Sequence, residues 1–240
     1  MIAREHTGKE KIVKIDDGYH GTAPWMQDKS RPGIIPSDND HVIKVKWNDI
    51  DSLSEILDKY SDQIACFISS PYDHPVSRDN SLPADDYWKK VTNLCKKHHV
   101  LTIVDDVRAG FRINLKGSNV AFGFSPDMIC FGKAIANGHP LASLVGNNDL
   151  KKSAEKVYFT GTQFFSAPPM AAAMATLKEL QKLDAPNRLI EYGNRLNQRL
   201  VKVASEEGFN LIASGMPSMP YYRLEDVNFE THFRLSLIHI

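Results

Sequence analysis

The sequence predicts an α/β domain built on a mostly parallel sheet with helices on both faces. Three apolar runs, at 64–68, 100–104 and 128–131, have the length of strands and do not alternate with polar residues, as in a sheet covered on both sides. Between the first two runs, apolar residues recur every three or four positions over 84–99, which is the spacing of one helical face. A strand, a crossover helix and a second strand make a βαβ unit with parallel strands.

The other elements follow from spacing and boundary residues. A helix is expected after Trp47-Asn48-Asp49, because Ile50, Leu53, Ile56 and Leu57 share one face. The apolar run 141–145 follows the third strand after a short connection, so we expect it to be antiparallel to its neighbour. Two long helices are predicted over 167–183 and 186–207; Gly208 ends the second, and a short strand follows at 209–213.

The chain divides into three expected parts. Residues 1–208 form a partial large domain, and residues 209–234 begin a smaller C-terminal domain. The last six residues, LSLIHI at 235–240, resemble the translated end of a transposon used in sequencing libraries, and we set them aside as a non-native scar; the alternative is a genuine strand. Because the chain opens in what resembles the end of a helix and stops soon after a new segment begins, we expect an incomplete chain.

Composition predicts an ordered, soluble chain without a charge bias. The 29 lysines and arginines balance the 29 aspartates and glutamates, so no basic excess argues for nucleic acid or a membrane surface as a partner. No apolar run approaches the ~18 residues of a membrane helix, and the start of the sequence lacks the apolar core of a secretory signal. Three scattered cysteines predict neither a disulfide framework nor a metal site, and favour a reduced, cytoplasmic compartment.

Two chemically useful residues follow predicted strands. Ligands of open α/β sheets lie outside the carboxyl ends of the strands, so Asp105 is placed to meet one; a strand-end aspartate also commonly starts a loop by binding nearby amides. Lys133 follows the strand 128–131 and a glycine. Burial there would lower its pKa from about 10.4 and leave an amine that attacks carbonyls; the alternative is a solvated surface charge.

An acid and a lysine at one sheet edge are what pyridoxal phosphate requires, since the lysine forms its Schiff base and the acid keeps its ring nitrogen protonated. The runs 105–112 (DDVRAGFR), 126–146 (PDMICFGKAIANGHPLASLVG) and 161–177 (GTQFFSAPPMAAAMATL) resemble class-III pyridoxal-phosphate aminotransferases, and among them glutamate-1-semialdehyde aminomutase and its relatives. Segment 3–24 (AREHTGKEKIVKIDDGYHGTAP) extends this similarity toward the start of the chain.

The resemblance implies the large domain of a fold-type-I pyridoxal-phosphate transferase, truncated at both ends. Lys133 matches the Schiff-base lysine that also moves the substrate proton, and Asp105 matches the carboxylate paired with the ring nitrogen. Val107 matches the apolar residue under one face of the ring. Lys133 and Asp105 are the catalytic candidates, and all three residues are candidates for binding the cofactor.

Further cofactor-binding candidates come from two loops. Tyr19, with His20 and Gly21, matches the aromatic residue that stacks on the other ring face, where an offset contact contributes roughly 0.5–1.5 kcal/mol. Thr162 matches a residue that reaches the phosphate of the neighbouring subunit, which makes a homodimer part of the site. Without the resemblance, Tyr19 reads as a core residue, His20 as a turn cap and Thr162 as a helix N-cap.

The resemblance implies amino-group transfer through a lysine aldimine, either between an amino acid and a keto acid or within one molecule. The alternatives are a pyridoxal-phosphate decarboxylase or epimerase of the same fold, and an inactive fragment that only binds. A nicotinamide-dependent Rossmann enzyme is disfavoured because no GxGxxG occurs. Arg108 stands where relatives more often have an uncharged residue, and Asp106 where many have Glu. Arg108 and Arg112 read mainly as solvated loop arginines, with a substrate carboxylate as the alternative ligand.

Overall fold

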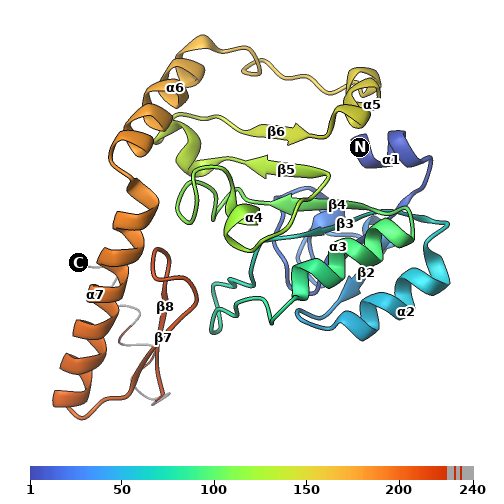
Figure 1. The fold of residues 1–240 in the computed structure, drawn as a ribbon. Helices are drawn as coiled ribbons and strands as arrows, with labels where there is room; N and C mark the ends of the chain where they lie inside the picture. The colour runs from blue at the N-terminus through green and yellow to red at the C-terminus, as the bar shows by residue number, and fades with distance from the viewer. Residues whose placement is uncertain (226–229, 231–232, 234–240) are drawn as a thin grey trace.

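The computed structural model describes residues 1–225, Glu230 and Phe233 of the 240-residue chain. Figure 1 shows a six-stranded sheet with the strand order β2-β1-β3-β4-β5-β6, in which the first five strands are parallel and β6 is antiparallel to β5. The strands are β1 (Lys11–Ile15), β2 (Val42–Val45), β3 (Ile64–Ser69), β4 (Leu101–Asp105), β5 (Met128–Phe131) and β6 (Ser143–Gly146).

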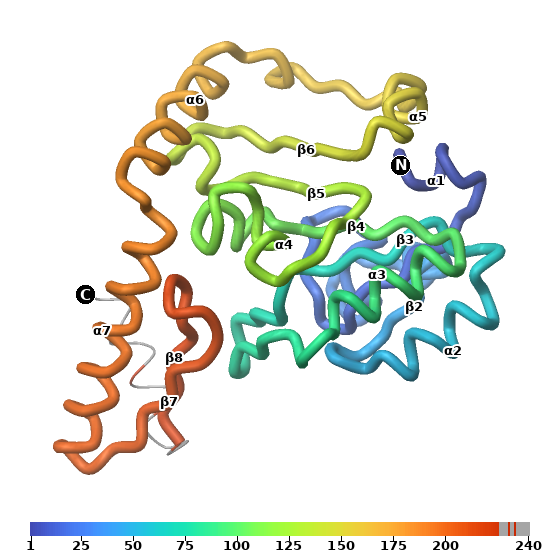
Figure 2. Tube along the Cα trace, viewed as in Figure 1, coloured from blue at the N-terminus to red at the C-terminus, as the bar shows by residue number. Residues whose placement is uncertain are grey.

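Helices pack on both faces of this sheet. Helices α2 (Ile50–Tyr60) and α3 (Tyr87–Lys97) bury their apolar stripes on one face, where the Trp88 and Phe124 rings stack at a centroid distance of 4.1 Å. On the other side, α1 (Ile2–Thr7) and α5 (Lys151–Lys156) lie side by side although they are far apart in the sequence (Figure 2). Helix α2 begins at the predicted place because the Asp49 side chain accepts a hydrogen bond from the Ser52 amide at 2.9 Å.

The predicted mostly parallel sheet is confirmed, including the antiparallel β6. The expectation that the three apolar runs are buried on both faces holds for β3, all of whose residues are buried, whereas β4 and β5 each contain half-buried residues. Leu101 and Ile103 of β4 are only half-buried, since the short α1 packs beside β1 and β3 and leaves part of that face uncovered.

Strands β1 and β2 were not predicted from the sequence. Each is short, and β1 contains Lys14, which interrupts its apolar pattern although it is buried in the sheet. The Lys14 ammonium is satisfied by the carbonyl oxygens of Gly18 and Met26, and burial lowers its pKa. A buried lysine with carbonyl partners is therefore the reason that the apolar pattern of β1 is broken.

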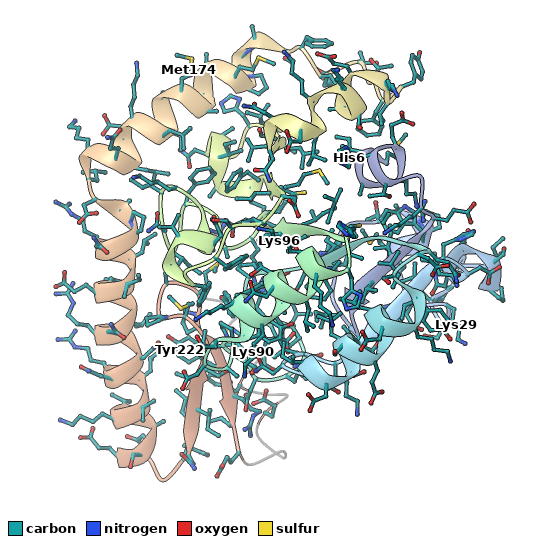
Figure 3. The ribbon with its side chains drawn as sticks, turned by 45° about the vertical axis from the view of Figure 1, so that its right-hand side comes forward. His6, Lys29, Lys90, Lys96, Met174 and Tyr222 are labelled. Carbon is teal, nitrogen blue, oxygen red and sulfur yellow. The ribbon has the colours of Figure 1, made fainter. Side chains whose placement is uncertain are left out.

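The C-terminal part contains two long helices and a hairpin. Helices α6 (Ala167–Lys182) and α7 (Ala185–Glu206) agree with the predicted spans to within a residue or two, and the strand predicted at 209–213 is β7 (Leu211–Ser214), paired antiparallel with β8 (Tyr221–Leu224). Tyr222, labelled in Figure 3, ties the hairpin to α7 by donating to Asn197 Oδ1 at 2.6 Å. The predicted scar at 235–240 lies outside the described residues.

Within the described part of the chain, no helix is long and apolar enough to cross a membrane. The smaller elements are the 3₁₀ turns η1 (Pro24–Met26), η2 (Pro36–Asn39), η3 (Lys133–Ala136) and η4 (Asn148–Leu150), and the short helix α4 (Ser118–Ala121). Because β1, β3, β4 and β5 are parallel, the segments that follow them all start at one edge of the sheet, and this edge holds the residues singled out above.

Candidate active site

Asp105 ends β4 and lies between two partners. Its Oδ2 accepts a hydrogen bond from His20 Nδ1 at 2.8 Å, and its Oδ1 accepts one from the Val107 amide at 3.1 Å. The His20 side chain is 2% exposed and that of Asp105 is 14% exposed, so the pair is nearly closed to solvent. The structure therefore brings together two residues that lie 85 positions apart in the sequence.

These contacts keep Asp105 ionised. Burial alone would raise the pKa of its carboxyl, but the His20 hydrogen bond and charge, the Val107 amide and the Lys133 charge together hold the pKa below its ordinary value. The charge of Lys133 acts on Asp105, so the two groups lie at the same edge of the sheet. A permanently anionic carboxylate at this edge suits a positively charged ligand atom.

The loop after β1 carries His20 into place. Lys14 binds the Gly18 carbonyl, and Gly18 itself approaches the Ile15 carbonyl and the His20 ring so closely that a Cβ there would lie 2.9 Å from Ile15 O. Gly21 has φ +112°, a conformation open mainly to glycine. Neither Lys14 nor Gly18 was singled out from the sequence; the lysine inside an apolar run was the available signal.

Lys133 begins η3, two residues beyond the last residue of β5, and has a left-handed φ of +43°. Such a conformation in a non-glycine residue is strained and is concentrated at functional sites. The side chain lines a groove of about 650 Å³, together with Phe111, Arg112 and Asn137 on the same side and residues of α6 opposite. The expected burial of Lys133 is wrong: it is exposed, because η3 projects past the sheet into this groove.

Val107 lies directly against the glycine that precedes Lys133. A Cβ on Gly132 would lie 3.0 Å from Val107 Cγ1, so only glycine permits this approach without displacement. The contact joins the segment after β4 to the segment after β5. The three strand-end candidates Asp105, Val107 and Lys133 are therefore assembled into one unit.

The loop candidates are placed differently. Tyr19 is 66% exposed, so it is not a core residue, and His20 binds Asp105 rather than capping a turn. Thr162 is exposed in the segment between α5 and α6, and the N-cap position of α6 is Ser166. The three simpler interpretations of these residues are wrong, while the cofactor contacts of Tyr19, Gly21 and Thr162 stay predictions.

Arg108 and Arg112 are not solvated loop arginines. Both are half-buried; Arg108 donates to the His74 carbonyl at 2.7 Å, and Arg112 Nη1 contacts Met219 Sδ at 3.5 Å. The turn after β4 directs both side chains inward, toward the segment that follows β3. Neither His74 nor Tyr72, two positions before it, was singled out from the sequence, because a tyrosine and a histidine in a predicted loop carry no signal of burial.

A lysine and an ionised carboxylate at the carboxyl ends of neighbouring parallel strands, with a histidine supporting the carboxylate, define the class of α/β transferases that use pyridoxal phosphate. The sequence comparison identifies the particular family. Residues 1–214 match the aminotransferase class-III family, and the chain belongs to it.

Curated relatives support this assignment. The chain is 35% identical over 220 residues to an aminopentol aminotransferase of Sphingopyxis macrogoltabida, covering 92% of this chain and 52% of the relative. It is 30% identical over 241 residues to a glutamate-1-semialdehyde 2,1-aminomutase of Legionella pneumophila (strain Paris), covering 95% and 56%. The resemblance inferred from the sequence motifs is confirmed at the level of the family. The chain spans about half the length of the curated relatives it matches.

Solved structures share the fold. The internal aldimine form of the FumI protein of Sphingopyxis sp. MTA144, with pyridoxal phosphate, superimposes with a TM-score of 0.90 at 35% identity, covering 94% of this chain and 54% of that one. A glutamate-1-semialdehyde aminomutase from Pseudomonas aeruginosa PAO1 superimposes with a TM-score of 0.79 at 22% identity, covering 92% and 53%.

Proposed function

We propose that the protein uses pyridoxal phosphate to move an amino group, either between an amino acid and a keto acid or within one molecule. The observation that carries the proposal is the Asp105 carboxylate, which His20 and Val107 hold ionised at the sheet edge where the charge of Lys133 reaches it. The family membership of residues 1–214 supports the same reaction class.

The residues present fit this cofactor. Asp105 is an anion with a small exposed part, which suits a protonated ring nitrogen, and the Gly132–Val107 contact gives an apolar surface beside it. Val107 and Tyr19 would contact the two faces of the ring, and Lys133 would be the point of covalent attachment. Pyridoxal phosphate supplies an electron-withdrawing ring that stabilises negative charge on a substrate carbon.

The chain's own groups account for proton movement. The Lys133 amine projects into an open groove, so it can change its position without breaking any packed contact. Once free, Lys133 Nζ is the base that takes a proton from the substrate carbon and returns it at a second position. His20 fixes the orientation of Asp105 throughout, since its Nδ1–H donates to Oδ2.

The test uses protein expressed from its complete coding sequence. Lys133→Ala is expected to abolish both the visible absorption band of the bound cofactor and the cofactor mass that borohydride fixes to the Lys133 peptide. Lys116→Ala, which removes an exposed lysine outside the site, is the matched control and keeps both signals. Cofactor fixed covalently to the Lys133→Ala protein would contradict the assignment.

We further propose a homodimer in which Thr162 completes the neighbouring subunit's site. The support is an exposed apolar surface around Thr162, formed by Tyr158 (88% exposed), Phe159 and Phe165 (87%), and continued on α6 by Met174, which is 62% exposed and labelled in Figure 3. A monomer rarely leaves such a surface uncovered.

Mixed subunits test this arrangement. Lys133→Ala and Thr162→Ala proteins are each expected to be impaired, and co-refolding them is expected to restore activity, because one site of the mixed dimer then has both native residues. If the mixture stays as inactive as its components, Thr162 acts within its own subunit or not at all, and the shared site is contradicted.

The division of the chain and its location complete the proposal. We propose that 1–208 is part of the cofactor-binding domain and that 209–234 begins a smaller domain, which the β7–β8 hairpin opens. A cytoplasmic location is supported by the three free cysteines, since Cys66 and Cys95 are buried and unpaired. Fractionation of cells that express the complete protein tests the location.

A further inference from the structure

Four side chains near Asp105 carry hydrogen-bond donors, and two of these side chains have a buried donor that no acceptor among the described residues receives. They are Tyr72 and His74, in the segment after β3, and Arg108 and Arg112, in the turn after β4. The proposed mechanism uses none of them. Their contacts with one another decide what kind of ligand they suit.

The Arg108–His74 contact fixes the protonation of the histidine. Arg108 Nη1 lies 3.3 Å from His74 Nδ1 and donates to the His74 carbonyl at 2.7 Å. A guanidinium only donates, so Nδ1 is the acceptor and the proton of the neutral ring is on Nε2. Burial and the Arg108 charge lower the pKa of His74 to about 4, which keeps the ring neutral at physiological pH. His74 Nε2–H is thus a buried donor without a partner among the described residues.

Tyr72 adds a second buried donor. The residue is 0% exposed, and within the part of the chain that the structure describes its hydroxyl has no hydrogen-bond partner. Burial raises the pKa of this phenol to about 12, so it stays protonated and able to donate. An unpaired buried hydroxyl is unfavourable, and a ligand atom that accepts a hydrogen bond from it would remove this cost.

The two arginines have no counter-charge in the described part of the chain. Neither forms an ion pair there, and the only partner of Arg112 is the weak acceptor Met219 Sδ. Burial, and after it the Arg108 charge, lower the pKa of Arg112. Guanidinium groups form strong charge-assisted hydrogen bonds with carboxylates and phosphates, so an anion is the ligand that suits these two cations.

The acids of the adjacent segments are already engaged. Asp73 binds Arg78, Asp105 binds His20, and Asp106 accepts from Ser118. Among the described residues, the Tyr72 hydroxyl and His74 Nε2–H are therefore left without an acceptor.

The cluster adjoins the proposed reaction site. The charges of Asp105 and His20 act on His74, which places the cluster beside that pair. Arg112 also lines the groove into which Lys133 projects. Trp88 fixes the start of the segment by donating to the Pro71 carbonyl at 2.8 Å, so the donors are held in place before any ligand arrives.

We propose that Tyr72, His74, Arg108 and Arg112 form a pocket that binds a carboxylate group of the amino or keto compound while its amino-bearing carbon lies at Lys133. The proposal rests on the proposed function, because it takes Lys133 as the reacting group. Guanidinium groups bind carboxylates through paired hydrogen bonds, and the substrates of this reaction class carry such groups.

The test compares substrates that differ only in the carboxylate. Protein from the complete coding sequence is reacted in single turnovers with L-alanine, 3-aminobutanoate and 4-aminobutanoate, and with 2-aminopropane, 2-aminobutane and 1-aminobutane, in which methyl replaces carboxylate. The loss of the cofactor's visible band gives the rate. The wild type is expected to favour at least one carboxylate by about 100-fold, as expected for two charge-assisted hydrogen bonds.

Three variants test whether the residues of the cluster cause the preference for carboxylate substrates. Arg108→Gln is expected to lower the preference by about tenfold or more and to change amine rates less than about threefold. Tyr72→Phe removes only a hydroxyl without a partner, so it is expected to leave the unfolding temperature unchanged or raised while the preference falls. Arg199→Gln, on the exposed surface of α7, is the matched control and keeps the wild-type preference.

The outcomes separate this inference from the proposed function. A wild type without a cofactor band contradicts the proposed function. A wild type with the band, whose carboxylate preference is absent or survives in both Arg108→Gln and Tyr72→Phe, contradicts the pocket alone. Inhibition of the amine reaction by propionate supports the pocket, whereas inhibition by inorganic phosphate and not by propionate assigns the cluster to phosphate and overturns the proposal.

Discussion

Asp105 and Asp106 are neighbours in sequence and meet opposite environments on the two sides of one strand end. Asp105 accepts from His20, an imidazole on another loop, and its pKa is held below the ordinary value. Asp106 is 1% exposed and accepts from the Ser118 hydroxyl at 2.6 Å and the Ser118 amide at 2.8 Å. Burial raises the pKa of Asp106 to about 6, and the Asp105 charge acts in the same direction. The two hydrogen bonds from Ser118 oppose this rise but do not cancel it.

The difference shows that the function of each carboxylate is set by its partners and not by its residue type. Asp105 has a partner that can be positively charged and a lysine at the same sheet edge, so it is a stable anion. Asp106 has neutral partners, and it ties the turn after β4 to the start of α4. One is a site residue and the other a structural one, and paired substitutions test this distinction.

The largest effect is expected on activity. Asp105→Asn is expected to lower the turnover rate by about 100- to 1000-fold, because the charge facing the cofactor is lost. Asp106→Asn keeps the shape of the side chain; its Oδ1 can accept from the Ser118 amide while its Nδ2 donates to the Ser118 hydroxyl, so the variant is expected to stay within about threefold of wild type. Steady-state rates of the two variants with one amino donor check this prediction. Equal losses of turnover rate would show that Asp105 and Asp106 serve the reaction alike.

The pH dependence of stability is expected to have opposite signs for the two residues. The pKa of Asp106 is about 6 in the folded protein, so its stabilising contribution is full below about pH 3.8 and is lost as pH rises through 6. Relative to Asp106→Asn, the wild type is expected to lose about 2 kcal/mol of unfolding free energy between pH 4 and 8. Asp105 has a lowered pKa, so its contribution is present above the ordinary value and lost as pH falls.

Urea unfolding of the wild type, Asp105→Asn and Asp106→Asn at several pH values measures both differences. The free-energy difference between wild type and Asp106→Asn falls with rising pH, and the difference between wild type and Asp105→Asn grows. Two differences of the same sign would contradict the contrast in environment.

Removing the donor to each carboxylate is expected to have smaller, separable effects. His20→Ala raises the pKa of Asp105 and is expected to slow turnover by about tenfold to a hundredfold, the value of a hydrogen bond to a charged group. His20→Asn keeps a donor near the position of Nδ1 and is expected to recover part of the rate. Ser118→Ala is expected to cost about 1–3 kcal/mol of stability at pH 8 without slowing the reaction. A rate loss in Ser118→Ala comparable to that in His20→Ala would show that Asp105 and Asp106 both serve catalysis.

The smallest effect is expected at a surface ion pair that lies away from both Asp105 and Asp106. Arg223 on β8 forms a two-bond ion pair with Asp79, at 2.9 and 3.0 Å, and both side chains are partly exposed. Because solvent screens such a pair, Arg223→Gln is expected to leave the unfolding free energy nearly unchanged, as measured by urea unfolding. A large loss would show that solvent does not screen this ion pair.

Much of the fold could be predicted because it depends on local pattern. The buried strands β3, β4 and β5, the antiparallel β6 and the helices α3, α6 and α7 follow from apolar periodicity and from connection lengths. Strand β1 could not be predicted, since Lys14 breaks its pattern and finds its carbonyl partners only in the folded chain. The inward direction of Arg108 and Arg112 could not be predicted either, since their contacts with His74 and Met219 also form only in the folded chain.

The sequence by itself determined that a carboxylate and a lysine follow two strands of one mostly parallel sheet, because strand direction alone brings their ends to a common edge. The tertiary structure decided that Asp105 is held as an anion, that the His20 ring donates a hydrogen bond to it, and that Lys133 projects into an open groove. Charge state and orientation depend on burial and on partners far away in the sequence, and these exist only once the strands and loops have packed.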